Sequence, residues 1–155
     1  MKTNTFRLLL MLAVPTLATG WITTGLGVTA AGWDSPSGQA GLSGTSWQLV
    51  RIQGSDGSTR VPKDRTKYTI TFGNDGRVTA RVDCNRGSST WKTAGSNQLK
   101  FGSWSMTRAK CSSGSLHDSI VRDGGAVRSY EIKNGHLFLS GMEEGGLYEL
   151  EPLGK

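Results

Sequence analysis

From Thr45 onward, the chain consists of short segments in which apolar and polar residues alternate. The clearest alternation lies at 47–52, 68–72 and 77–82. A period of two is typical of half-buried strands, because successive side chains point to opposite faces of a sheet. Further strands are predicted at 89–93, 98–102, 127–133, 136–140 and 147–150. The pattern therefore predicts a mostly antiparallel sheet of about eight strands.

Short turns rich in Asn and Gly separate several of these segments. Residues 74–76 (NDG) join two predicted strands, and residues 134–135 (NG) join two others. A Gly-Gly pair at 145–146 marks a third turn. Asn and Gly tolerate the positive φ angles that tight hairpins require. These turns indicate that consecutive strands pair with each other.

One segment, 115–123, breaks the alternation. Its apolar residues follow at i, i+4 and i+5: Leu116, Ile120 and Val121. Ser113 or Ser115 can cap its first turn, and Gly124 with Gly125 can end it. We therefore predict one short helix packed on the sheet. The expected fold class is α+β, with a curled sheet or incomplete β-barrel.

The first residues have the order of a secretory signal peptide. Lys2 and Arg7 precede a short apolar run at 8–14, and small residues follow. We predict cleavage after Ala30 or Ala31. The protein is then exported, to the periplasm or beyond the cell.

The predicted organisation is a signal peptide at 1–31, a flexible linker at 32–43 and one domain at 44–153. The linker contains Pro, Ser and Gly and little that is apolar. The alternative to a cleaved signal is a membrane anchor at 8–33. That stretch is long enough to span a bilayer, but its second half is rich in Thr and Gly, which lowers its hydropathy.

The net charge of +6 at pH 7 is spread along the chain. Acidic residues are interleaved with the basic ones, which is typical of solvated strand faces and predicts no nucleic-acid partner. A weak attraction to anionic lipid or to an envelope polymer stays open. We expect a monomer whose partner is an envelope protein or an apolar ligand.

Two cysteines in an exported chain are expected to pair. Cys84 ends a predicted strand, and Cys111 lies shortly before the predicted helix. A bridge closing this loop stabilises the fold by about 3 kcal/mol in the chain-entropy model. The alternative is a reactive thiol, Cys111, with His117 as its base.

Several short runs resemble the META domain family, which includes the heat-shock HslJ-like proteins. The opening residues 44–49 (GTSWQL) resemble the start of that domain. Residues 83–87 (DCNRG), with the later Trp91, and residues 106–111 (MTRAKC) resemble its two cysteine motifs. The closing strands are also similar, at 127–130 and 134–139. The likeness covers about residues 42–153.

The resemblance implies a cracked antiparallel barrel with one helix. Family members are exported, often associated with the envelope, and linked to stress or drug tolerance and in some organisms to secretion or virulence. The resemblance brings no shared catalytic activity and no cofactor. One departure stands out: the family usually has apolar residues after the helix, where this chain has Gly124, Gly125 and Ala126. This change should thin the core there.

The matching motif residues are Trp47, Asn85, Arg86, Gly87, Trp91 and Thr107. Asn85 and Gly87 suit a sharp turn beside a disulfide, where Arg86 can pair with Asp83. The two tryptophans are predicted core residues, with a ligand-lining role as the alternative.

No catalytic or metal-binding motif is present in the sequence. His117 and His136, the only histidines, are far apart in the chain. We therefore expect no catalytic residue, no metal and no cofactor. The preferred hypothesis is a non-enzymatic envelope protein that acts under stress or drug exposure. The second is a binding module for an apolar ligand or for a secretion or envelope partner, and nothing positive supports an enzyme.

Overall fold

The computed structural model describes residues 41–141 and 146–154. The predicted signal peptide, the alternative anchor at 8–33 and most of the predicted linker lie outside these residues. The described part contains one α-helix, one 3-10 helix and ten strands. In chain order they are β1 (Thr45–Gln53), β2 (Thr59–Arg60), η1 (Arg65–Lys67), β3 (Tyr68–Phe72), β4 (Arg77–Val82), β5 (Asn85–Ala94), β6 (Gln98–Phe101), β7 (Ser105–Met106), α1 (His117–Gly124), β8 (Val127–Lys133), β9 (His136–Gly141) and β10 (Leu147–Pro152).

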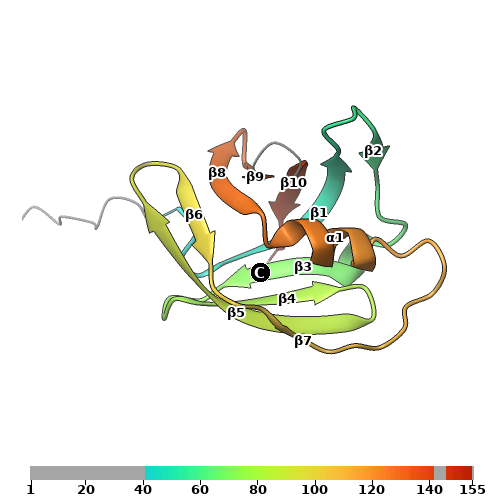
Figure 1. Cartoon of the computed structure of the whole chain (residues 1–155). Helices are drawn as coiled ribbons and strands as arrows, with labels where there is room; N and C mark the ends of the chain where they lie inside the picture. The colour runs from blue at the N-terminus through green and yellow to red at the C-terminus, as the bar shows by residue number, and fades with distance from the viewer. Residues whose placement is uncertain (1–40, 142–145, 155) are drawn as a thin grey trace, which may run out of the picture. The chain divides into compact units, whose positions relative to one another are not determined.

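The strands close into a barrel (Figure 1). The sheet runs in the order β10-β9-β8-β6-β5-β4-β3-β1, and β10 pairs with β1 to complete the ring. β2 pairs with β1, and β7 pairs with β5. The predicted mixture of antiparallel strands with one short helix is confirmed. The expected curled or incomplete sheet is corrected: the barrel is more closed, because the last strand pairs with the first.

The closure is strong at one joint and weak at another. β1 and β10 pair from Trp47↔Pro152 to Gln53↔Leu147. β6 and β8 share only the pair Gln98↔Ser129, and the Tyr130 N–H donates to the carbonyl of Asn97 at 2.8 Å beside it. Since ladder hydrogen bonds hold neighbouring strands together, the β6–β8 joint is the weakest point of the ring.

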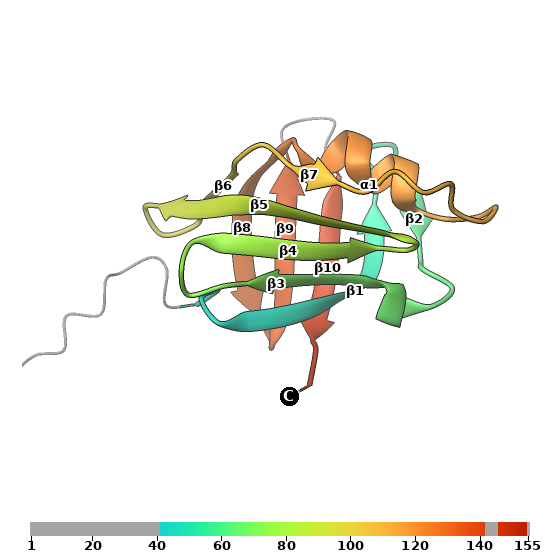
Figure 2. The same ribbon diagram turned by 90° about the horizontal axis from the view of Figure 1, so that it is seen from below.

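β1 turns the corner between the two halves of the barrel. Its first residues pair with β3, and its register with β10 shifts between Leu49 and Arg51. An extra residue of this kind bends a strand. Figure 2 shows the result: β3, β4 and β5 lie across the direction of β8, β9 and β10.

The barrel interior holds a continuous apolar core built from the alternating positions. It includes Trp47, Leu49, Ile52, Tyr68, Ile70, Phe72, Val78, Val82, Trp91, Leu99, Val127, Tyr130, Leu137, Leu139, Tyr148 and Leu150. Leu42 joins this core and is completely buried, although its sequence position falls in the predicted linker. The chain therefore enters the core before β1 begins.

The helix and the predicted turns at 74–76 and 134–135 are confirmed, with small shifts, while the third predicted turn, at 145–146, lies partly outside the described residues. Asn134 and Gly135 have φ values of 53° and 78°, as a tight hairpin requires. α1 begins at His117, and Ser115 Oγ accepts a hydrogen bond from the His117 N–H at 3.1 Å. None of the residues of α1 is buried. Within the described ranges, no helix has the length and apolar character needed to cross a membrane.

Candidate functional site

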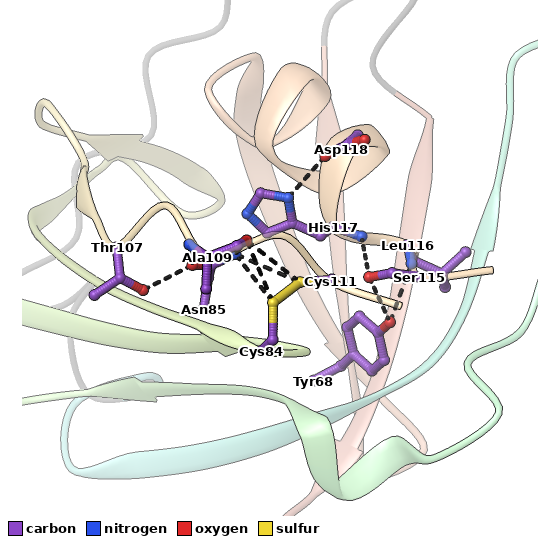
Figure 3. Close-up of polar contacts among 10 residues, drawn as sticks. All are labelled: Tyr68, Cys84, Asn85, Thr107, Ala109, Cys111, Ser115, Leu116, His117 and Asp118. Atoms are coloured by element: carbon purple, nitrogen blue, oxygen red, sulfur yellow. Dashed lines mark hydrogen bonds and ion pairs between the residues drawn. A yellow bond between two sulfur atoms is a disulfide. The ribbon is translucent and has the colours of Figure 1, made fainter. Parts of the chain in front are cut away.

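Cys84 and Cys111 form a disulfide, which confirms the predicted pair (Figure 3). Their Cα atoms are 5.5 Å apart, and the bridge joins residues 27 positions apart. It ties the connection between β4 and β5 to the loop that leads into α1. Because both sulfur atoms are bonded, the alternative of a reactive Cys111 with His117 as base is excluded.

Asn85 lies directly beside the bridge and is completely buried (Figure 3). Its amide oxygen accepts hydrogen bonds from the Ala109 N–H at 2.7 Å and the Thr107 hydroxyl at 2.8 Å. Its amide nitrogen donates to the Ala109 carbonyl at 2.9 Å. A buried polar group is tolerated when its hydrogen bonds are made, and Asn85 makes them through both its amide oxygen and its amide nitrogen. It therefore clamps the segment before α1 onto β5.

The neighbouring motif residues complete this clamp. The Thr107 N–H donates to the Arg86 carbonyl at 2.9 Å, and the Arg86 N–H donates to Thr107 Oγ1 at 3.0 Å. Gly87 allows close approach, since a Cβ there would lie 2.4 Å from Met106 Sδ. We call Cys84, Asn85, Thr107 and Cys111 the motif lock.

The suggested pair of Arg86 with Asp83 is not formed. The carboxylate of Asp83 lies 3.9 Å from Lys67 Nζ instead. Asp83 has a φ of 56°, which turns the chain between β4 and β5. The Arg86 side chain has no hydrogen-bond or ion-pair partner among the described residues, although its backbone is bonded to Thr107.

Trp47 and Trp91 are core residues, 6% and 4% exposed. The Trp47 indole N–H donates to Thr45 Oγ1 at 2.7 Å. Trp91 packs edge-to-face on Phe72, with ring centroids 5.1 Å apart. Neither tryptophan lines the cavity described next, so the structure places both with the scaffold.

The barrel contains an apolar cavity of about 390 Å³. Its lining comes from α1, from the loop after β6 and from every barrel strand except β5. The residues that line it include Leu49, Tyr68, Ile70, Ala80, Val82, Phe101, Trp104, Met106, Ile120, Val121, Gly124, Gly125, Val127, Leu139, Tyr148 and Leu150. The interior of the barrel is therefore partly hollow.

The helix α1 forms one wall of the cavity. Ile120 is partly buried, and Val121 is 45% exposed although it lines the cavity. A Cβ added at Gly124 or Gly125 would meet no heavy atom within 4 Å. The two glycines therefore leave open space at this edge, which agrees with the thinner core that the sequence predicts there.

Hydrogen bonds anchor α1 near both of its ends. Tyr68 Oη accepts a hydrogen bond from the Leu116 N–H at 3.0 Å and lies 3.4 Å from Ser115 Oγ (Figure 3). Further along, Arg60 Nη1 donates to Ser119 Oγ at 2.5 Å. At the glycine end, the Gly125 carbonyl accepts a hydrogen bond from Arg128 Nη1 of β8 at 2.8 Å.

Three buried polar atoms on or near α1 have no partner among the described residues: Tyr148 Oη, Arg60 Nε and His117 Nε2. Burial, and next the negative charge of Asp123, raises the pKa of Tyr148 to about 12. A buried polar atom without a partner costs free energy. The cavity end of the barrel therefore contains buried polar atoms without hydrogen bonds to the described residues, whereas Asn85 in the motif lock makes its hydrogen bonds.

The histidines do not form a shared site. His117 Nδ1 lies 2.9 Å from Asp118 Oδ1, and His136 Nδ1 lies 2.9 Å from Glu149 Oε1. Among the residues that the structure describes, no three acidic, histidine or cysteine side chains gather as a metal site would require.

Sequence reasoning missed most of the cavity lining. Trp104 lies outside the strands, and Met106 belongs to a two-residue strand, so neither has a periodic pattern that points inward. The only signal was the run Gly124-Gly125-Ala126 after the helix. Alternation identifies the remaining lining residues as buried, but it does not show that they surround a cavity.

Comparison with known proteins identifies the family and the fold. The META domain family model matches residues 40–151. A solved NMR structure of a protein from Burkholderia xenovorans is similar, with a TM-score of 0.61 and 16% identity, covering 92% of this chain and 100% of that one.

A crystal structure of a DUF4847 family protein from Bacteroides vulgatus is also similar. Its TM-score is 0.54 at 16% identity, over 73% of this chain and 95% of that chain. At this identity the likeness concerns the fold alone. No curated protein sequence matches the chain.

Proposed function

The chain belongs to the META domain family, and on that premise we propose that it is an exported, non-catalytic binding module whose barrel holds a small apolar ligand. The observation that carries this proposal is the cavity of about 390 Å³. Ligand sites in proteins are concave, mostly apolar and about 300–1,000 Å³ in volume. The cavity lies at the small end of that range.

The lining indicates an uncharged ligand. Its deep part consists of aliphatic side chains such as Ile70, Leu139 and Leu150, and Trp104 adds an aromatic wall. Arg81 is the only charged residue among those that line it. Since a charge placed among apolar side chains pays a large desolvation cost, a neutral ligand is favoured.

The lining also supports a binding role rather than a catalytic one. The described residues around the cavity include no histidine, carboxylate or thiol. General acid–base chemistry needs such groups within hydrogen-bond reach of the reacting atoms. Tyr148 is the nearest candidate, and its raised pKa disfavours the phenolate that a base would need.

The disulfide supports export. Disulfides form and persist in oxidising compartments and are rare in the cytosol. The bridge lies beside Asn85 at the centre of the motif lock, where it ties two loops together. A fold built around this bond suits a protein that works outside the cytoplasm.

The proposal is tested with N-phenyl-1-naphthylamine, a neutral apolar probe that fluoresces in apolar surroundings. We expect saturable binding of one probe per protein. Val121→Trp should weaken it about tenfold or more by filling the cavity edge. Val61→Trp is the matched control, since Val61 is 55% exposed and does not line the cavity. Absence of saturable binding, or equal weakening by both variants, would overturn the proposal.

The proposed physiological setting is tolerance of envelope stress or apolar drugs, as the family resemblance implies. A deletion strain should be more sensitive to apolar antibiotics and detergents than its parent. Wild-type protein should restore tolerance, whereas Val121→Trp should not. Full rescue by Val121→Trp would separate the phenotype from the cavity.

A further inference from the structure

The outer face of β3, β4, β5 and β7 carries a hollow lined mainly by polar residues. Figure 2 views the barrel from the side on which β3, β4 and β5 lie in front. The hollow has a volume of about 520 Å³. It is lined chiefly by Thr69, Thr71, Thr79, Arg81, Arg86, Ser88, Ser105 and Thr107.

The strand register arranges hydroxyl groups in a continuous row. The partners in order are Ser46↔Thr71, Thr71↔Thr79, Thr79↔Ser88 and Ser88↔Ser105. The row therefore crosses five strands, and Ser46 Oγ lies 2.9 Å from Thr71 Oγ1 at one end. Neighbouring strands are about 4.8 Å apart, so the row offers hydroxyls at a regular spacing.

A second row runs beside the first and carries charge. Its partners are Gln48↔Thr69, Thr69↔Arg81 and Arg81↔Arg86. Arg81 and Arg86 thus stand directly opposite each other on adjacent antiparallel strands. Like charges in this position repel and destabilise the pair. The repulsion is relieved when an anion lies between the two guanidinium groups.

Both guanidinium groups have N–H donors that make no hydrogen bond to the described residues. Arg81 Nε donates to the Asp83 carbonyl at 3.2 Å, and the Arg86 side chain has no hydrogen-bond or ion-pair partner in the described part of the chain. No acidic residue lines the hollow. The nearby carboxylate of Asp83 is engaged by Lys67, and that of Asp64 by Thr66.

We propose that this face binds an acidic glycan: a sugar chain whose carboxylate or phosphate groups meet Arg81 and Arg86 while its hydroxyls pair with the row from Ser46 to Ser105. Arg forks recognise such anions through paired hydrogen bonds. A single-stranded nucleic acid would call for stacking aromatics, which the lining lacks. The two sites share Thr69, Ala80, Arg81 and Met106 in their linings, whereas Arg86 lines the hollow and not the cavity. Arg86 is therefore the residue that tests this proposal separately from the apolar ligand.

The test titrates protein purified from an expressing host with tetragalacturonic acid, followed by backbone amide NMR. Maltotetraose is the neutral comparison and inorganic polyphosphate the sugar-free polyanion. We expect saturable shifts confined to β3, β4, β5 and β7. Binding should be about fivefold or more weaker for Arg86→Gln, since a charge-assisted hydrogen bond is lost. Lys133→Gln, which removes one positive charge elsewhere, should have no effect.

A second pair of variants tests the hydroxyl row. Thr79→Val and Ser88→Ala should weaken tetragalacturonic acid about two- to threefold while leaving polyphosphate unchanged, because they remove neutral hydrogen bonds only. Arg86→Gln should also leave the thermal transition unchanged or raised, since it removes repulsion. Equal losses for Arg86→Gln and Lys133→Gln, equal binding of maltotetraose, or shifts spread over the whole barrel would overturn the proposal.

Discussion

The motif lock and the cavity end of the barrel lie close together, yet they are built in opposite ways. In the lock, a completely buried Asn85 makes hydrogen bonds to Thr107 and Ala109, and a disulfide lies beside it. At the cavity end, Tyr148 Oη has no partner among the described residues, and Gly124 borders open space. Helix α1 connects the two, since the lock precedes its start and the glycines form its end.

The difference separates scaffold from candidate function. The residues by which the family is recognised make the lock, where each polar group serves to hold the chain. The cavity is lined partly by side chains outside those motifs, such as Trp104 and Val121, and partly by residues within the matching runs, such as Leu49 and Met106. The lock holds the chain just before α1, and α1 in turn contributes Ile120 and Val121 to the cavity wall.

The largest expected effect is at the centre of the lock. Asn85→Ala removes the hydrogen-bond partner of three groups at Thr107 and Ala109 and leaves a cavity at a completely buried position, so we expect a loss of about 4 kcal/mol in the free energy of unfolding. Urea denaturation measures it. Thr107→Val, which removes one of these bonds, should cost about 1–2 kcal/mol. A loss below that of Thr107→Val would show that the lock is not the stability centre.

The second largest loss of stability is expected on removal of the disulfide. Replacing both Cys84 and Cys111 by Ala lowers the free energy of unfolding by about 3 kcal/mol, because the unfolded chain regains the freedom of a 27-residue loop. Reduction of the wild type with a phosphine should produce a similar loss. Reduction of the double variant should change nothing, and any change there would point to an effect of the reagent.

Truncation of a side chain in the α1 wall of the cavity should lower the free energy of unfolding less than truncation elsewhere in the core. Ile120→Ala enlarges a space that already exists, so we expect a cost of about 1 kcal/mol. Ile52→Ala, in a side chain that is 1% exposed and does not line the cavity, should cost about 3 kcal/mol. Comparable losses for the two variants would mean that α1 packs as firmly as the strands, which would remove the contrast between the regions.

The smallest effect should have the opposite sign. Tyr148→Phe removes a buried hydroxyl without a partner, so it should stabilise the protein by about 0.5–1 kcal/mol at neutral pH. The raised pKa of Tyr148, about 12, adds a pH signature. Below pH 10, Tyr148 is protonated in both the folded and the unfolded protein. As the pH rises from 10 towards 12, Tyr148 ionises first in the unfolded chain, which lowers the free energy of unfolding. The gain from Tyr148→Phe should therefore grow over that interval, as denaturation at several pH values would show.

Local patterns predicted the elements well. The alternation at 68–72 and 77–82 matches β3 and β4, because each strand has one face towards a core and one towards water. The Asn134-Gly135 turn was also predictable, because Asn and Gly tolerate positive φ angles. The Cys84–Cys111 bridge was predictable because two cysteines in a chain expected to be exported usually pair. The suggested Arg86–Asp83 pair was wrong, because the turn at Asp83 directs its carboxylate to Lys67.

The sequence by itself determined the strands, the short helix, the disulfide and the family, because these depend on neighbouring residues or on recognisable motifs. Only the tertiary structure decided three features: closure of β10 on β1, the cavity beside α1, and the opposition of Arg81 and Arg86. The physical reason is register. Which side chains stand opposite one another, and whether they fill the space between them, is set by pairing between strands, and closure of the ring joins strands from the two ends of the domain.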